Sequence, residues 1–162
     1  ERLFTGIQQL LAGLRGSLYL AVMITATIFA AATGIVGSSV TLLGVMAAPS
    51  MTKSNYDVRM SAGVITAGGT LGILIPPSVM LIVMGPVVGV PATDLFAAAV
   101  IPGLLLSGIF TSYCLVRCWL KPELGPALPA ELRPKALGPV IRELLIGVVP
   151  VIVVILSTLG VI

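Results

Sequence analysis

The sequence predicts an all-α polytopic membrane protein that contains a re-entrant helical hairpin and a broken transmembrane helix. Hydrophobic residues make up 57% of the chain, charged residues make up 9%, and the mean hydropathy is +1.16. A water-soluble domain of that composition could not cover its surface with polar groups. Charged side chains occur only at the ends of the long apolar runs, and two of these runs are longer than one membrane span and interrupted near their centres.

The first segment, residues 1–17, has apolar side chains at helical spacing. Its polar side chains, including Arg2 and Arg15, turn largely to other faces. This pattern is typical of an amphipathic helix lying in the membrane interface. The apolar positions are Leu3, Phe4, Ile7, Leu10, Leu11 and Leu14.

The second segment, residues 18–48, has no charged side chain. As one straight helix it would reach roughly 46 Å, well beyond the ~30 Å hydrocarbon core of a bilayer. Gly34, Gly37, Ser38 and Ser39 divide it into two arms that are each too short to cross. We therefore predict a re-entrant hairpin with its tip near the membrane midplane. The second arm is expected to begin near Ser38 or Ser39, whose hydroxyls would cap it or bind a ligand.

A polar stretch, residues 49–59, predicts a cytoplasmic loop, and residues 60–90 predict a broken transmembrane helix. Its centre contains closely spaced glycines followed by Pro76-Pro77-Ser78. Proline has no amide hydrogen, so the two prolines release the carbonyls of Gly72 and Ile73 from the helical ladder. Irregular backbone at membrane depth is tolerated only where protein buries it or water reaches it, so the break is expected to face a cavity.

The remaining segments continue this alternation. Residues 95–119 predict an ordinary transmembrane helix, capped by Thr93 or Asp94, and residues 120–139 a proline-rich cytoplasmic connector. Residues 140–162 predict a further transmembrane helix, which is expected to be truncated where the chain ends.

The distribution of basic residues favours the hairpin over a single crossing. If residues 18–48 enter and return, Arg2, Arg15, Lys53 and Arg59 share one face with the basic residues between 117 and 142. A single crossing would divide these residues between both faces, contrary to the preference of Lys and Arg for the cytoplasmic side. The formal charge of +3 is thereby explained without a nucleic-acid partner.

The two interruptions suit different ions. A helix beginning inside the membrane presents unpaired N–H groups and a positive dipole end, which favour an anion. The Gly72 and Ile73 carbonyls and the Thr70 and Ser78 hydroxyls form an uncharged oxygen set that suits sodium. The alternative interpretation is that the glycines serve close helix packing and the prolines only shape the helix.

Other chemistry is poorly supported. The chain has no histidine, and Cys114 and Cys118 alone cannot complete a zinc site, so packing is their expected role. The apolar runs contain no ionisable group for a proton relay and no nucleophile with a base. We expect no enzyme activity and no cofactor other than sodium as a coupling ion.

Four strings resemble the large membrane subunit, the DctM-like permease, of tripartite ATP-independent periplasmic (TRAP) transporters. They are Gly37-Ser-Ser-Val-Thr41, Tyr56-Asp57, Ala67-Gly-Gly-Thr-Leu-Gly-Ile-Leu-Ile-Pro-Pro-Ser78 and Ile101-Pro-Gly-Leu-Leu105. The resemblance implies a multi-pass protein of the bacterial inner membrane, part of an elevator-type inverted-repeat transporter. It implies sodium-driven import of small organic anions such as dicarboxylates, a small membrane subunit as partner and a periplasmic substrate-binding protein.

The resemblance and the residue chemistry together give the expected site. Sodium is expected at Gly37, Ser38, Gly72, Ile73 and Ser78, and substrate at Ser38, Ser39, Thr70, Pro76 and Pro77. The chain has Val36 where many members have a serine, and 162 residues cannot hold the second, inverted half. It is therefore expected to be a first-repeat fragment. The alternatives are a carrier of another elevator-type ion-coupled family and a channel, which would conduct without coupling.

Overall fold

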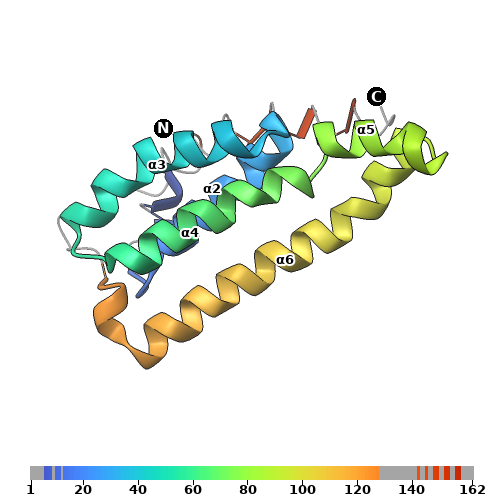
Figure 1. Ribbon diagram of the computed structural model, residues 1–162. Helices are drawn as coiled ribbons and strands as arrows, with labels where there is room; N and C mark the ends of the chain where they lie inside the picture. Colours follow the sequence, from blue (N-terminus) through green and yellow to red (C-terminus); the bar gives the residue numbers. More distant parts are fainter. Residues whose placement is uncertain are drawn as a thin grey trace.

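A computed structural model describes residues 6–8, 10, 11 and 13–127, together with residues 142, 145, 148, 149, 152, 153, 156 and 157. This part of the chain is helical and contains no strand, which confirms the all-α prediction (Figure 1). Of the expected interfacial helix 1–17, residues 1–5, 9 and 12 lie outside the described residues, and residues 6–8 and 10 are helical. The expected final helix 140–162 lies largely outside the described residues. The elements are α2 (Ser17–Thr33), α3 (Val36–Lys53), α4 (Val58–Thr70), η1 (Leu71–Ile73), α5 (Val79–Val88), α6 (Ala92–Leu120) and η2 (Pro122–Leu124).

Helices α2 and α3 form a helical hairpin that turns at Gly34 and Ile35. Gly34 has φ +60°, a left-handed conformation that glycine adopts without steric cost, and Ile35 is extended. Helix α3 begins at Val36, two to three residues before the expected start near Ser38 or Ser39. The expected cap by these serines is wrong, since the N-cap is Ile35 and makes no side-chain capping bond. The two serines lie in the first turn, where their hydroxyls donate back to the Ile35 carbonyl at 3.1 and 2.9 Å.

The expected loop 49–59 is also wrong, because only residues 54–57 separate α3 from α4. Helix α3 continues through Pro49 to Lys53. A proline inside a helix removes one backbone hydrogen bond. The buried stripe Leu43, Ala47 and Met51 runs past Pro49 on one face of α3, and its packing offsets that loss.

The following apolar run is interrupted between Ile73 and Val79. Helix α4 tightens into η1, the Pro76–Pro77 peptide bond is cis, and α5 begins after Ser78. Helix α6 starts earlier than expected, at Ala92. Its N-cap is Pro91 and makes no side-chain capping bond, so the predicted cap at Thr93 or Asp94 is wrong. Asp94 instead lies in the first turn, where its charge suits the helix dipole.

Helix α2 lies at the centre of the bundle and contacts α3, α4, η1 and α6. Two glycines of α4 allow this close approach: a Cβ on Gly68 would lie 2.8 Å from the Cβ of Ala26, and one on Gly69 would clash with Val40. For these two residues the packing interpretation holds. The fully buried core residues include Leu18, Tyr19, Val22, Met23, Leu43, Ala47, Met51 and Leu71.

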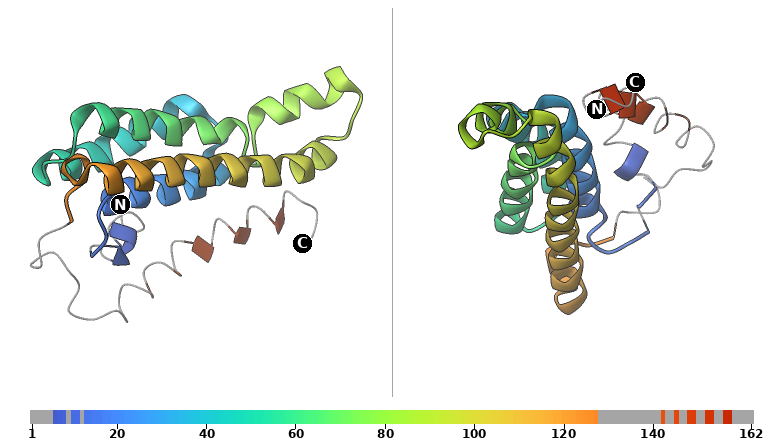
Figure 2. Two further views of the ribbon diagram at one scale, coloured as in Figure 1. Left: turned by 90° about the horizontal axis from the view of Figure 1, so that it is seen from below. Right: turned by 90° about the vertical axis from the view of Figure 1, so that its right-hand side faces the viewer.

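Figure 2 shows α5 and the start of α6 projecting beyond the α2–α3–α4 bundle. Most side chains of α5 are exposed and apolar, as are many along α6. Among the described residues, one helix, Ala92–Leu120, is both long enough and apolar enough to cross a membrane. The apolar helices Ser17–Phe29 and Val79–Val88 are shorter.

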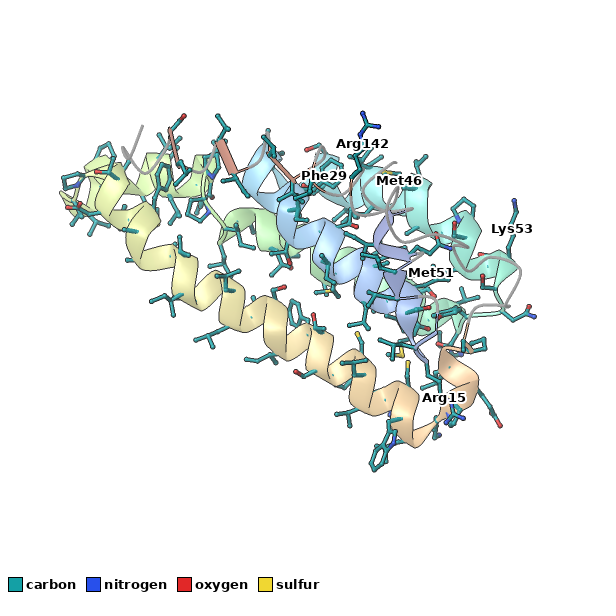
Figure 3. The ribbon with its side chains drawn as sticks, turned by 180° about the vertical axis from the view of Figure 1, so that it is seen from behind. Arg15, Phe29, Met46, Met51, Lys53 and Arg142 are labelled. Carbon is teal, nitrogen blue, oxygen red and sulfur yellow. The ribbon has the colours of Figure 1, made fainter. Side chains whose placement is uncertain are left out.

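The two ends of the bundle differ, and we name them separately. The base comprises the start of α2, residues 54–57, the end of α6 and η2, which hydrogen bonds hold together. The Tyr56 and Ser17 hydroxyls are 3.3 Å apart, and the Tyr19 hydroxyl donates to the Leu124 carbonyl at 2.7 Å. The predicted connector 120–139 therefore begins by folding back on the hairpin. Arg15 and Lys53 lie at this end (Figure 3).

Candidate functional site

At the opposite end, the hairpin turn lies against the interruption of the broken helix. We call this contact the tip junction; it comprises Gly34 and Ile35 with residues 71–78. A Cβ added to Gly34 would collide with the Pro77 carbonyl oxygen and lie 3.3 Å from the Ser78 Cα. A Cβ added to Gly72 would lie 3.7 Å from the Ile35 backbone nitrogen. Two interrupted segments about 40 residues apart in sequence thus meet through their backbones.

The third side of the tip junction comes from α6. A Cβ on Gly103 would lie 2.9 Å from Ile75 Cγ1 and 3.5 Å from the Leu74 carbonyl oxygen. Gly103 belongs to the Ile101-Pro-Gly-Leu-Leu105 string, so this string packs against Leu74 and Ile75 of the interruption. A side chain at Gly103 would require the Ile75 side chain to shift, whereas its approach to the Leu74 carbonyl would be an ordinary van der Waals contact.

Within the interruption, the carbonyl released by Pro77 has acquired another donor. The Ser78 hydroxyl, whose residue is completely buried, donates to the Ile73 carbonyl at 2.7 Å. This bond replaces the backbone bond that Pro77 cannot make. A hydroxyl that donates its hydrogen keeps its lone pairs, and a carbonyl has two, so both oxygens retain the capacity to bind a cation.

The predicted site residues divide into exposed and buried groups. Gly37, Ser38 and Thr70 are exposed, and a Cβ on Gly37 would meet nothing within 4 Å. Gly37 therefore has no packing reason among the described residues to be glycine. Ser39 is only 2% exposed and its hydroxyl is turned inward to the Ile35 carbonyl, so it is not displayed beside Ser38.

The remaining predicted residues belong to the interruption itself. Gly72 and Pro76 are buried, Pro77 is half-buried and Ile73 is 41% exposed. The Thr70 hydroxyl donates to the Ala67 carbonyl at 2.7 Å, so it too is bonded within its own helix. The structure thus brings Gly72, Pro77 and Ser78 directly onto the hairpin turn and leaves Gly37, Ser38 and Thr70 on the surface.

Sequence reasoning missed Gly34, Ile35 and Gly103 as parts of this arrangement. Gly34 was visible as one of the interrupting residues, but the requirement for a positive φ angle there was not. The Ile35 carbonyl accepts three hydrogen bonds, from the Ser38 and Ser39 hydroxyls and from the Ser39 N–H. An isoleucine carbonyl carries no signal in a sequence, so this acceptor could not have been predicted.

The chemistry of the tip junction is uncharged and based on oxygen. Neither apolar run that forms it contains an Asp, Glu, Lys, Arg or His side chain. Among the described residues there is no group of three or more His, Cys, Asp or Glu side chains that could hold a metal ion. Backbone carbonyls and hydroxyls bind hard monovalent cations, whereas helix N–H groups bind anions.

Comparison with known proteins identifies the family. The family described as the tripartite ATP-independent periplasmic transporter, DctM component, matches residues 1–162, the whole of the chain. The chain belongs to this family. The TRAP resemblance drawn from the four strings is confirmed, and the alternative assignment to another elevator-type family is wrong.

Individual relatives agree with the assignment. The chain is 39% identical over 93 residues to the C4-dicarboxylate TRAP transporter large permease protein DctM of Pseudomonas aeruginosa, which is 57% of this chain and 22% of that protein. It is 34% identical over 128 residues to the corresponding Rhodobacter capsulatus protein, covering 69% of this chain and 29% of that protein. It is 29% identical over 116 residues to the ectoine TRAP transporter large permease protein TeaC of Halomonas elongata, covering 72% and 27%.

These relatives are named as transporter permeases, not as enzymes. Their names specify different solutes, including a C4-dicarboxylate and ectoine. Membership of the family therefore does not select a dicarboxylate. The chain spans between about a fifth and a third of the length of these relatives.

Proposed function

We propose that this chain forms part of a sodium-coupled secondary transporter that imports small organic anions. The observation that supports this most directly is the tip junction, where a helical hairpin and a broken helix meet through their interrupted backbones. Discontinuous helices that meet in this way place helix ends and freed carbonyls around a solute in secondary transporters.

Sodium binds, in this proposal, at the carbonyls of Gly72 and Ile73 and the hydroxyl of Ser78, with Gly37 and Ser38 at the start of α3 nearby. The 2.7 Å bond between Ser78 and Ile73 holds two of these oxygens in place before an ion arrives. Such preorganisation lowers the cost of ordering ligands around the cation.

The organic anion binds over the exposed side of the same junction. Ser38 and Thr70 are exposed there, and the first turn of α3 supplies the positive end of its dipole. Pro76 and Pro77 form the floor of this proposed anion site. Ser39 acts indirectly, by holding the Ile35 carbonyl with its buried hydroxyl.

The transporter lies in the bacterial inner membrane as a multi-pass protein, with the base on the cytoplasmic side. Arg15, Lys53, Arg59 and Arg117 all belong to the base or its edge, which agrees with the cytoplasmic preference of basic residues. Its partners are a small TRAP membrane subunit and a periplasmic substrate-binding protein that delivers the anion. We propose that transport proceeds by an elevator-type motion, as the resemblance implies.

The test is uptake by the complete transporter in proteoliposomes, with and without an inward sodium gradient. We expect uptake to require sodium, and Ser78→Ala to raise the sodium concentration for half-maximal uptake by about tenfold, equivalent to about 1.4 kcal/mol. Ser38→Val is expected to weaken substrate transport more than sodium binding.

Thr66→Val is the matched control, because Thr66 is an exposed α4 hydroxyl that bonds to its own helix, one turn before Thr70. Its sodium dependence and uptake are expected to match the unmodified protein. Unchanged sodium dependence in both serine variants would reject the proposed sodium site. Uptake that needs no sodium gradient would favour a channel.

A further inference from the structure

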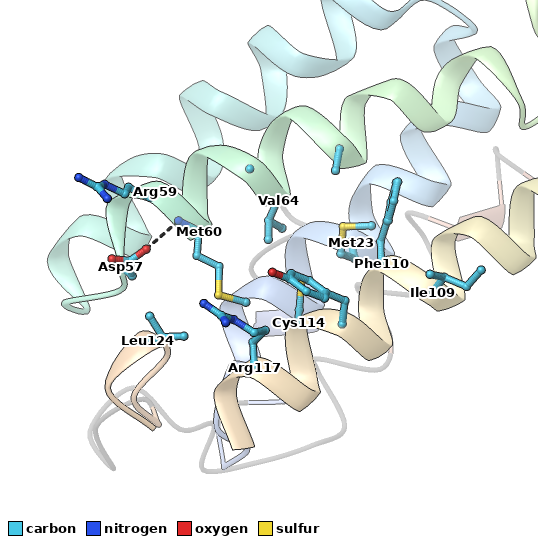
Figure 4. Close-up of a pocket in the computed structure, with 13 residues that line it drawn as sticks. Met23, Asp57, Arg59, Met60, Val64, Ile109, Phe110, Cys114, Arg117 and Leu124 are labelled. Atoms are coloured by element: carbon cyan, nitrogen blue, oxygen red, sulfur yellow. Dashed lines mark hydrogen bonds between the residues drawn. The ribbon is translucent and has the colours of Figure 1, made fainter. Parts of the chain in front are cut away.

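A groove of about 740 Å³ lies between α4 and α6, and none of its lining residues belongs to the tip junction (Figure 4). One face of α4 and one face of α6 form its walls, at the three- and four-residue spacing of a helix. Met23 of α2 contributes to its floor. The wall residues are Met60, Gly63, Val64 and Ala67 on α4, and Ile109, Phe110, Tyr113, Cys114 and Arg117 on α6.

The groove is apolar along most of its length. Met23 at its floor and Val64 and Cys114 in its walls are buried, whereas Ile109 and Tyr113 are about 60% exposed at its rim. A long apolar groove with an open rim matches a flexible hydrocarbon chain better than it matches a polar solute.

One end of the groove is charged. Asp57, Arg59 and Arg117 line it there, and Figure 4 shows the Arg117 side chain extending from α6 toward the start of α4. The Asp57 carboxylate accepts the Met60 N–H at 2.7 Å and so caps α4. Within the part of the chain that the structure describes, neither arginine forms an ion pair, and both are exposed. The Arg117 guanidinium is therefore available at the mouth of the groove, whereas Figure 4 shows the Arg59 side chain pointing outward at its edge.

We propose that this groove binds one phospholipid with an anionic headgroup, its acyl chain between α4 and α6, its phosphate at Arg117 and Arg59 at the outer edge of the headgroup. Guanidinium groups bind phosphate through paired hydrogen bonds, and basic residues at the cytoplasmic face attract anionic lipids. The two arginines share the base with Arg15 and Lys53, which puts the headgroup at the membrane surface and the apolar floor toward the hydrocarbon. The proposal rests on the proposed membrane location but on neither sodium coupling nor the transported solute.

The test is native mass spectrometry of the complete purified transporter, titrated with phosphatidylglycerol or with phosphatidylcholine of equal chain length. We expect one phosphatidylglycerol to bind at least tenfold more tightly than phosphatidylcholine. The double variant R59Q/R117Q is expected to lose this preference, and R59K/R117K to retain most of it. Inorganic phosphate at millimolar concentration is expected not to displace the lipid, because the acyl chain contributes to binding.

Two further variants distinguish lipid binding in the groove from attraction of lipid by surface charge alone. Gly63→Leu places a side chain in the groove, and a Cβ there would meet nothing within 4 Å, so we expect folding to be kept and both lipids to lose the specific site. Lys53→Gln removes an exposed basic residue outside the groove and is expected to change neither affinity.

An unchanged lipid preference in R59Q/R117Q would overturn the proposal. So would a structure of the complete transporter in lipid nanodiscs in which protein side chains fill the groove. Because the readout is lipid binding and not uptake, failure here is distinguishable from failure of the proposed transport function.

Discussion

The two ends of this helical bundle are held together by different means. At the base, side-chain hydroxyls bridge separate segments: Tyr19 reaches Leu124, and Tyr56 reaches Ser17. At the tip junction, the backbones of two segments meet directly, and hydroxyls such as Ser38 and Thr70 bond within their own helices.

The two ends therefore differ in the hydrogen-bonding groups that they leave available to a ligand. Hydroxyls committed to other segments, as at the base, fix the helix ends in place but offer little to a ligand. Backbones in contact, with oxygen atoms that keep unused lone pairs, leave acceptors for an ion. The tip junction is therefore sensitive to added volume, and the base is sensitive to lost hydrogen bonds.

Gly34→Val is expected to cause the largest loss of stability. A Cβ at this position would collide with the Pro77 carbonyl, and the residue has φ +60°, which a β-branched side chain adopts at high cost. We expect a loss of about 3 kcal/mol or more, measured as thermal unfolding of the complete permease.

The matched control is Gly37→Ala, in the first turn of α3. Its Cβ would meet nothing within 4 Å, so we expect stability to be unchanged or raised by up to about 1 kcal/mol. Transport is nevertheless expected to fall, because Gly37 belongs to the proposed site. Equal losses of stability in the two variants would contradict the distinction between them.

Tyr19→Phe tests the base. The variant keeps the ring in the core but removes the hydroxyl that donates to the Leu124 carbonyl at 2.7 Å. We expect a loss of about 1–2 kcal/mol, because the part-buried Leu124 carbonyl loses the shorter of its two hydrogen bonds and keeps only the Asp57 N–H at 3.2 Å. Tyr113→Phe, at an exposed position on α6, is the control and is expected to change stability by less than about 0.5 kcal/mol.

Ser78→Ala is expected to have a smaller effect on stability than Tyr19→Phe. It removes the donor to the Ile73 carbonyl, and since Ile73 is 41% exposed, water can replace part of that bond. A loss of about 1 kcal/mol is expected in thermal unfolding. The same variant is expected to reduce sodium affinity, so an effect on stability alone would leave Ser78 as a purely structural residue.

The sequence predicted the helical fold and the two interrupted runs because length, hydropathy and glycine–proline placement are local properties. Gly34 and Pro76-Pro77 could therefore be identified from the sequence as points of interruption. Where prediction failed, tertiary packing decided the outcome: α3 continues through Pro49 because Leu43, Ala47 and Met51 pack on one buried face.

For the candidate site, the sequence predicted only the chemical character of the residues at the two interruptions. Gly72, Ser38 and Ser78 could be named from their types and spacing, whereas the inward turn of Ser39 and the support from Gly103 depend on contacts between distant segments. The Ile35 carbonyl, which accepts from both tip serines, belongs to a residue whose type gives no indication of this role.

The smallest effect at neutral pH concerns Tyr56 at the base. Burial raises the pKa of its phenol above the ordinary value of 10. The protonated phenol is therefore favoured in the folded state, so its contribution to stability is complete below about pH 10 and is lost as pH rises through the higher folded pKa. We expect no effect between pH 7 and 9, and a decline in the unfolding midpoint above about pH 10 that is smaller in Tyr56→Phe. An equal decline in both proteins would show that other groups at the base, not the buried Tyr56 hydroxyl, set the alkaline limit.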